Sequence, residues 1–147
     1  METQRTDILV EWDERFSVGI DAMDNQHKKL FELTNNLYAA CLKGKDAVNK
    51  YFYEVIHETV DYIRFHFTAE ERILEQIQYP RLVEHRKEHE AFVQRVLNDV
   101  KEFEDGRAFV PNAFVRFLKD WILTHIAVSD REGYAKYIEE LKKKGYV

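Results

Sequence analysis

Residues 63–92, IRFHFTAEERILEQIQYPRLVEHRKEHEAF, decide the fold of this chain. Apolar side chains recur every three or four positions on both sides of Tyr79-Pro80, which is the spacing of amphipathic helices. Proline is favoured in the first turn of a helix. The pair therefore predicts a tight connection between one helix that ends near Gln78 and another that begins near Pro80. Both predicted helices carry ionisable side chains on their apolar faces.

The remainder of the chain follows the same pattern. Gly44, Asp105-Gly106 and Pro111 separate further helix-length segments, as glycine and proline commonly do. The pattern predicts helices over about 21–43, 46–78, 80–104 and 111–128, followed by a shorter one over about 131–144. Asp46 is the expected N-cap of the second helix. Four long helices joined by short turns favour an all-α fold, an up-down-up-down four-helix bundle with a short C-terminal helix.

Residues 1–20 lack the helical pattern and are predicted to form an N-terminal arm. Trp12 and Phe16 in this arm are expected to pack along the helical bundle, which covers residues 21–147. A length of 147 residues suits one hydrophobic core. We therefore expect a single domain over residues 1–147.

The composition excludes several classes of protein. The formal charge is -5 and no run of basic residues forms a stripe, so nucleic acid is not an expected partner. The single cysteine, Cys41, excludes an internal disulfide framework and is expected to be a small core residue. No window of about 18 successive apolar residues predicts a membrane span. The first residues lack a secretory signal pattern, so a cytoplasmic location is expected.

Five of the six histidines fall on the predicted interior faces of the four helices. His66 lies in the apolar stripe of the second helix, and Glu70 follows four residues later on the same face. His57 lies nine residues before His66, about half a turn out of phase at about 100° per residue. It is expected to face outward and has no assigned role. The predicted interior ionisable set comprises His27, His66, Glu70, His85, His89 and His125.

Clustered interior imidazoles indicate a metal site, because an ionisable group is costly to bury without a partner. Imidazole with carboxylate suits iron, zinc or manganese better than magnesium or calcium. A ferritin-like di-iron bundle would need two Glu-x-x-His motifs, and only Glu54/His57 has that spacing, on the outward face. His85-Arg-Lys-Glu88-His89 matches the pattern of inverzincin proteases, with Glu88 as general base beside one zinc. That alternative leaves the other three interior histidines without a role.

The order and spacing of the motifs resemble the hemerythrin family, specifically the single-domain bacteriohemerythrins. The resemblance covers nearly the whole chain, and each motif is weak alone but specific in combination. The matching segments are Trp12, Val18-Gly19-Ile20-Asp21, Asp24-x-Gln26-His27-x-x-Leu30, His66-Phe67-x-x-Glu70-Glu71, Tyr79-Pro80, His85-x-x-x-His89-x-x-Phe92 and Trp121-x-x-x-His125-Ile126-x-x-x-Asp130.

The resemblance implies two iron ions in unequal surroundings. It implies that His85, His89 and His125 fill the coordination of one iron, while His27 and His66 hold the other and leave a position open. Glu70 and Asp130 would bridge the two ions, with an oxo or hydroxo group as a third bridge. Asp130 comes from the resemblance alone, since five residues after His125 is about 140° off the face of a regular helix. It would reach the site only if the fourth helix loosens or ends there.

The resemblance also implies a dry apolar pocket in which dioxygen binds at the open iron. The residues at the positions of the pocket wall are Leu30, Phe67, Trp121, Ile122 and Ile126. Each of these could equally be an ordinary core residue. Ser129, beside Asp130, departs from the apolar residue expected there. Its hydroxyl is predicted to admit water and to speed oxidation of the iron.

The function predicted from the sequence is reversible dioxygen binding for storage, delivery or sensing, rather than catalysis. The alternatives are an oxidase, peroxidase or nitric-oxide-handling enzyme that uses the same open iron, and an iron- or oxygen-responsive module that binds a partner protein. No acid, base or substrate pocket beyond the metal ligands is apparent, which disfavours the enzyme. An oxygen-consuming enzyme or a redox protein is the kind of partner expected.

Overall fold

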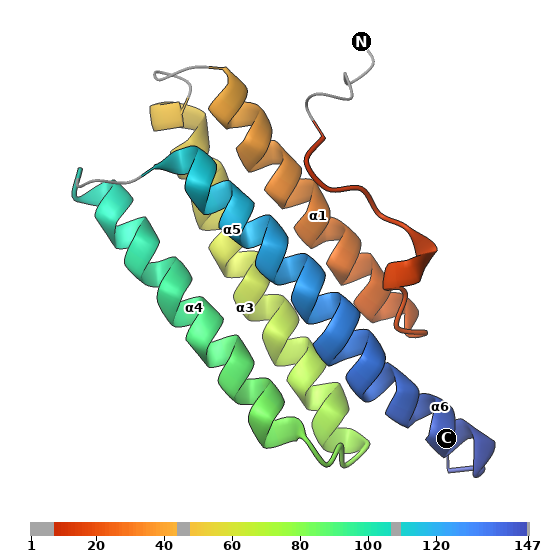
Figure 1. Cartoon of the computed structure of the whole chain (residues 1–147). Coiled ribbons are helices and arrows are strands. Elements are labelled where there is room, and N and C mark those ends of the chain that lie inside the picture. Colours follow the sequence, from red (N-terminus) through yellow and green to blue (C-terminus); the bar gives the residue numbers. More distant parts are fainter. Residues whose placement is uncertain (1–7, 44–47, 107–109, 147) are drawn as a thin grey trace.

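The computed structural model describes residues 8–43, 48–106 and 110–146, which form an all-helical bundle without a strand in those ranges (Figure 1). The predicted four-helix bundle is confirmed. α1 packs against α3 and α5, and α3 packs against α4. The helices of the bundle are α1 (Asp21–Leu42), α3 (Tyr53–Gln76), α4 (Leu82–Glu104) and α5 (Pro111–Thr124), with a π-helical turn, η3 (Val48–Phe52), before α3.

The helix boundaries near Tyr79-Pro80 differ from the prediction by about two residues. α3 ends at Gln76, and α4 begins at Leu82 rather than at Pro80. Gln78 adopts a left-handed backbone with φ of 55°, while Tyr79 N–H donates to the carbonyl of Leu74 at 2.9 Å. This hydrogen bond closes a Schellman-type end, which satisfies carbonyls that the helix leaves free. The predicted N-cap, Asp46, lies outside the described residues.

The fourth helix does not end near Val128 as predicted. α5 continues without interruption into a π-helix, η4 (His125–Ala135), and then into α6 (Lys136–Lys143) (Figure 1). The predicted fifth helix is therefore the last part of the same helical rod. The sequence predicted a break between two helices at this point. The chain instead forms a π-helix, which is wider than an α-helix because its hydrogen bonds join residues five apart rather than four.

The described part of the N-terminal arm, residues 8–20, packs along α1, as expected (Figure 1). Asn35 on α1 fixes the arm because its amide oxygen accepts hydrogen bonds from Leu9 and Val10 N–H, both at 2.9 Å. The rings of Trp12 and Phe16 lie 5.7 Å and 5.5 Å from the ring of Phe31. The arm therefore covers one side of α1 with aromatic side chains.

The core consists of two apolar clusters with a polar band between them. The larger cluster includes Leu30 on α1, Phe67 on α3 and Phe92 on α4, and the smaller one includes Met23 on α1 and Leu74 on α3. The predicted interior histidines and Glu70 fall between these positions along the helices. Charged side chains are therefore enclosed by apolar layers above and below.

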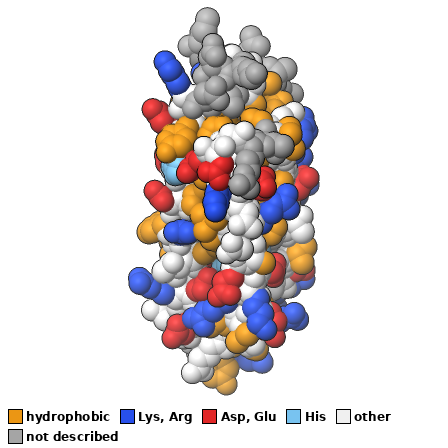
Figure 2. Space-filling model, turned by 90° about the vertical axis from the view of Figure 1, so that its left-hand side faces the viewer, with side chains coloured by type: hydrophobic (Ala, Val, Ile, Leu, Met, Phe, Trp, Pro, Cys, Tyr) orange, Lys and Arg blue, Asp and Glu red, His pale blue; other side chains and the backbone are white. Residues whose placement is uncertain are grey.

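The outer surface carries charges of both signs. Figure 2 shows acidic and basic side chains interspersed with apolar ones on one face of the molecule. Among the described segments, none of the helices has the length and apolar character needed to span a membrane.

Candidate metal centre

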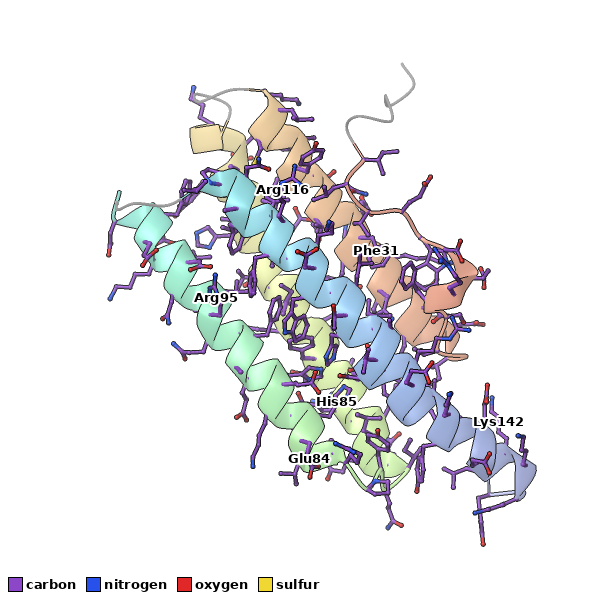
Figure 3. All side chains as sticks on the ribbon, viewed as in Figure 1. Phe31, Glu84, His85, Arg95, Arg116 and Lys142 are labelled. Carbon is purple, nitrogen blue, oxygen red and sulfur yellow. The ribbon has the colours of Figure 1, made fainter. Side chains whose placement is uncertain are left out.

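The structure brings all seven predicted ligands together in the polar band between the two apolar clusters. Each of these side chains is at most 4% exposed. Figure 3 shows His85 inside the bundle, whereas its neighbour Glu84 lies on the outer side of α4. The seven come from α1, α3, α4 and η4, and they are His27, His66, Glu70, His85, His89, His125 and Asp130.

Three histidines surround one oxygen of Glu70, and we call them the three-histidine cluster: His85, His89 and His125. The Nε2 atoms of His85 and His89 lie 2.7 Å and 3.2 Å from Glu70 Oε1. The Nε2 atoms of His89 and His125 lie 3.0 Å from each other. Ring nitrogens and a carboxylate oxygen therefore converge on one small volume.

Two further histidines face the other oxygen of Glu70, and we call them the two-histidine pair: His27 and His66. Both Nε2 atoms lie 3.5 Å from Glu70 Oε2. The two rings are 4.7 Å apart and nearly perpendicular, at 77°. The pair and Glu70 form a second group whose donor atoms could hold an ion.

Both carboxylates face the two groups at once. Glu70 directs one oxygen to each group, as described above, and Asp130 does the same. Asp130 Oδ1 lies 3.2 Å from Nε2 of both His85 and His125, while Oδ2 lies 3.3 Å from Nε2 of His27. Each carboxylate is therefore placed to bridge two ions, one in each group.

The π-helix explains how Asp130 reaches this position. In an α-helix, residues five apart point in directions that differ by about 140°. In a π-helix, hydrogen bonds join residues five apart, so such residues come close to the same face. Because η4 begins at His125, both His125 and Asp130 face the bundle interior. The sequence allowed Asp130 to reach the site if the fourth helix either loosens or ends there, and the structure shows that the helix loosens.

The outward nitrogens of three histidines are paired with side chains that the sequence prediction missed. The Nδ1 atoms of His66, His89 and His125 lie 2.7, 2.8 and 3.1 Å from side-chain oxygens. An imidazole that donates from Nδ1 presents Nε2 as the lone-pair nitrogen, which is the state that a metal requires. The accepting residues are Gln26, Glu71 and Glu88, respectively.

Four buried polar atoms in the band make no hydrogen bond. They are both carboxylate oxygens of Asp130 and both ring nitrogens of His27. Three of them have the ion-pair contacts of 3.2 to 3.3 Å described above, but buried polar atoms without a hydrogen bond are rare and costly. Metal ions between the imidazoles and carboxylates would satisfy three of these atoms, and the mixed nitrogen and oxygen donor set suits iron. The residues present therefore fit the metal that the sequence resemblance implies.

The histidines and carboxylates shift one another's pKa values strongly. Burial alone would lower the pKa of His27 and His85, but Asp130 and Glu70 outweigh it and raise both to about 9. Burial would raise the pKa of Glu70, but the surrounding histidines hold it well below its usual range. Without metal, protonated His27 and His85 therefore form buried ion pairs with the carboxylates, whereas burial lowers the pKa of His66 to about 4 and leaves it neutral.

The predicted pocket-wall residues lie around this centre. Leu30, Phe67, Ile122 and Ile126 are buried, and Trp121 is half-buried. Phe67 stacks on His89 with ring centroids 3.7 Å apart, and Trp121 stacks on His125 at 4.4 Å. The two aromatic walls thus lie against the three-histidine cluster. Their role in a dioxygen pocket stays a prediction.

Ser129 does not lie among the pocket-wall residues. Its hydroxyl donates to Glu88 Oε1 at 2.7 Å, and it lines a surface cavity of about 610 Å³ together with His85 and Glu88. The cavity opens on the side of the three-histidine cluster. The predicted effect of Ser129 on water access remains a prediction.

The positions of His57 and Glu88 bear on two further predictions from the sequence. His57 is half-exposed and faces Glu104, with Nε2 3.0 Å from Oε1, so the prediction that it has no role at the site is consistent with its place. Glu88 contacts the outward nitrogen of His125, not the side that faces Glu70. This placement disfavours Glu88 as the base of a one-zinc protease.

Comparison with known proteins gives one consistent result. The family model described as the Hemerythrin HHE cation binding domain matches residues 18–137. A bacteriohemerythrin from Clostridium acetobutylicum is 37% identical over 124 residues, which cover 82% of this chain and 95% of that protein. A bacteriohemerythrin from Pseudomonas aeruginosa is 36% identical over 123 residues, covering 84% of this chain and 77% of that protein.

Solved structures agree with the sequence comparisons. The crystal structure of a wild-type hemerythrin superposes with a TM-score of 0.78 at 27% sequence identity. The match covers 84% of this chain and 93% of that one. The helical bundle described above is thus similar to that hemerythrin along most of its length.

Proposed function

The chain belongs to the hemerythrin family, and from that premise we propose that it holds two iron ions and binds dioxygen reversibly between its helices. Family membership and the histidine and carboxylate cluster support iron binding. The observation that carries the proposal is the division of seven buried ligands into two groups that share two carboxylates. This arrangement suits two ions rather than one, because each carboxylate presents a separate oxygen to each group.

The two ions would be coordinated unequally. The three-histidine cluster offers three nitrogens and one oxygen from each bridging carboxylate. The two-histidine pair offers two nitrogens and the other two oxygens. With an oxo or hydroxo group as a third bridge, the first ion would have six ligands and the second five. The sixth position of the second ion is where we propose that dioxygen binds.

When bound, the iron pair supplies a binding position for dioxygen and the electrons that hold it. The chain itself holds the ligands in place and excludes water. Leu30, Ile122 and Ile126 are at most 3% exposed and belong to the apolar cluster that borders the polar band on one side. A water-poor surrounding limits proton delivery to reduced oxygen, which favours release of dioxygen unchanged. This is the physical reason to propose binding rather than enzymatic turnover.

Tyr134 closes the opposite side of the centre. Its hydroxyl donates to Glu70 Oε2 at 2.9 Å, and the ring is completely buried in the smaller apolar cluster. The hydrogen bond holds the oxygen that faces the two-histidine pair. We propose that Tyr134 keeps Glu70 in the bridging orientation when the oxidation state of the irons changes.

The proposal predicts the iron content and its environment. Apo protein reconstituted anaerobically with ferrous iron should hold two ions per chain. Mössbauer spectroscopy should then resolve two inequivalent iron sites, because the ligand sets differ by one histidine. A saturating content of one ion per chain, or two equivalent sites, would contradict the proposal.

A further inference from the structure

Glu88 accepts hydrogen bonds from two residues of η4 with a single oxygen. The Nδ1–H of His125 donates to Glu88 Oε1 at 3.1 Å, and the hydroxyl of Ser129 donates to the same atom at 2.7 Å. His125 and Ser129 are four residues apart, so both lie on the side of η4 that faces α4. The carboxylate is thereby held next to Nδ1 of His125, the ring nitrogen that faces away from the predicted iron position.

Glu71 supports His89 in a different way. Its Oε2 accepts from His89 Nδ1 at 2.8 Å, while its Oε1 accepts from Arg86 Nε at 3.2 Å. The guanidinium therefore compensates the charge of Glu71. The hydroxyl of Ser129 holds Glu88 but does not neutralise it, and no lysine or arginine in the described part of the chain forms an ion pair with Glu88.

The two-histidine pair has no comparable support. His66 Nδ1 donates to the neutral amide oxygen of Gln26 at 2.7 Å, and His27 Nδ1 makes no hydrogen bond. A carboxylate that accepts from a ligating imidazole raises the basicity of that ligand and fixes its tautomer. Within the described residues, outer carboxylates thus contact ligating histidines of the three-histidine cluster and not those of the two-histidine pair.

We propose that Glu88, held by Ser129, is a positioning residue that strengthens His125 as a ligand and favours the ferric state of the iron bound by the three-histidine cluster. This inference rests on the proposed iron-binding function and concerns residues outside the seven ligands. The negative charge of Glu88, transmitted through the Nδ1–H of His125, makes Nε2 a stronger donor to the metal. Ser129 keeps the carboxylate in position at the edge of the cavity, where it would otherwise rotate into solvent.

Two measurements separate the effect of the negative charge of Glu88 from the effect of its position beside His125. The first is the rate at which anaerobic ferrous protein loses iron to an excess of a ferrous chelator. The second is the reduction potential of the di-iron centre. Glu88→Ala removes both charge and acceptor, Glu88→Gln keeps an acceptor without the charge, and Ser129→Ala removes the holding hydroxyl.

Loss of outer-shell partners typically costs about 10- to 100-fold in metal affinity, so Glu88→Ala should release one iron about 10- to 100-fold faster. Glu88→Gln should release it less than about 10-fold faster but should raise the reduction potential. Ser129→Ala should give an intermediate release rate, and Ser129→Thr should restore it. Glu84→Gln is the matched control, because Glu84 lines the same cavity and makes no hydrogen bond to a histidine; it should change neither measurement.

The results distinguish this inference from the proposed function. If the unchanged protein holds two irons but Glu88→Ala and Glu88→Gln match it in both release rate and potential, the role of Glu88 is wrong and the function stands. An equal shift in Glu84→Gln would show a general charge effect and would also overturn the inference. If the unchanged protein holds no iron, the proposed function itself fails.

Discussion

The histidines of the three-histidine cluster make more hydrogen bonds and stacking contacts with surrounding side chains than those of the two-histidine pair. In the cluster, His89 and His125 each donate to an outer carboxylate and each stack on an aromatic ring, Phe67 or Trp121. In the pair, His66 donates to a neutral amide and the outward nitrogen of His27 makes no hydrogen bond. If two iron ions bind as proposed, the fold would hold one ion through more outer contacts and would leave the other with a smaller ligand set, as an open binding position requires.

The largest effect is expected from a change in the three-histidine cluster. His85→Ala removes a nitrogen that lies close to both Glu70 and Asp130, at 2.7 Å and 3.2 Å from their oxygens. Without it, both bridging carboxylates lose a fixed partner, so iron content should fall from two ions per chain to nearly none. Metal analysis after reconstitution and gel filtration checks this. Retention of two ions would show that the cluster is not the anchor.

A change in the two-histidine pair should act on oxygen before it acts on total iron. His66→Ala should leave about one ion per chain, because the cluster is intact, and should abolish the response to dioxygen. His27→Ala should behave alike. The control is His57→Ala, since His57 is half-exposed and contacts Glu104 away from the centre. A variant of the pair that still binds dioxygen reversibly would remove the assigned open position.

The dependence of iron binding on pH follows from the raised pKa values of His27 and His85, which are about 9. A raised pKa means that these ion pairs stabilise the apo protein fully below the usual value of 6.5 and that this stability is lost as pH rises through 9. Iron must displace the protons. Iron affinity should therefore rise between pH 6.5 and 9, with proton release on loading, while the apo protein becomes less stable.

Chelator competition and thermal unfolding, each followed across this pH range, measure both trends. The melting temperatures of loaded and apo protein should diverge as pH rises. An iron affinity that is flat between pH 6.5 and 9, with no proton release on loading, would contradict the assignment of protonated imidazoles in the apo site.

The smallest effect is expected when a histidine of the two-histidine pair is given an outer carboxylate like those of the three-histidine cluster. Gln26→Glu places a carboxylate on His66 Nδ1, in the manner of Glu71 on His89. A more basic His66 should favour the ferric state, so conversion to the diferric protein in air should become faster by a factor of a few, which is below the effect of about 10- to 100-fold that follows the loss of an outer partner. Gln76→Glu adds the same charge at an exposed position and serves as the control. An unchanged rate in Gln26→Glu would mean that outer partners do not set the difference between the sides.

The sequence predicted the fold and most of the centre because helical periodicity places four histidine-bearing faces and Glu70 inside the bundle. It could not place Asp130 by periodicity, because the π-helix of η4 changes the angle between residues five apart. The predicted end of the fourth helix near Val128 falls within this π-helix. Asp130 was predicted through family resemblance only.

The outer partners escaped prediction for another reason. Gln26, Glu71 and Glu88 lie at partly or largely exposed positions, where glutamine and glutamate are ordinary. Only the spatial approach of α1, α3 and α4 to the ligating rings reveals their contacts. A usable signal for all three is adjacency to a predicted ligand, since Gln26 precedes His27, Glu71 follows Glu70 and Glu88 precedes His89.

The most direct test of the central claim is the optical spectrum of the reduced, iron-loaded protein before air exposure, in air and after oxygen is removed, with iron counted per chain. We expect two ions per chain and a colourless reduced protein that becomes coloured in air and bleaches when oxygen is withdrawn, over repeated cycles. A protein that holds two ions but shows no reversible colour, or that consumes oxygen continuously without bleaching, would contradict it.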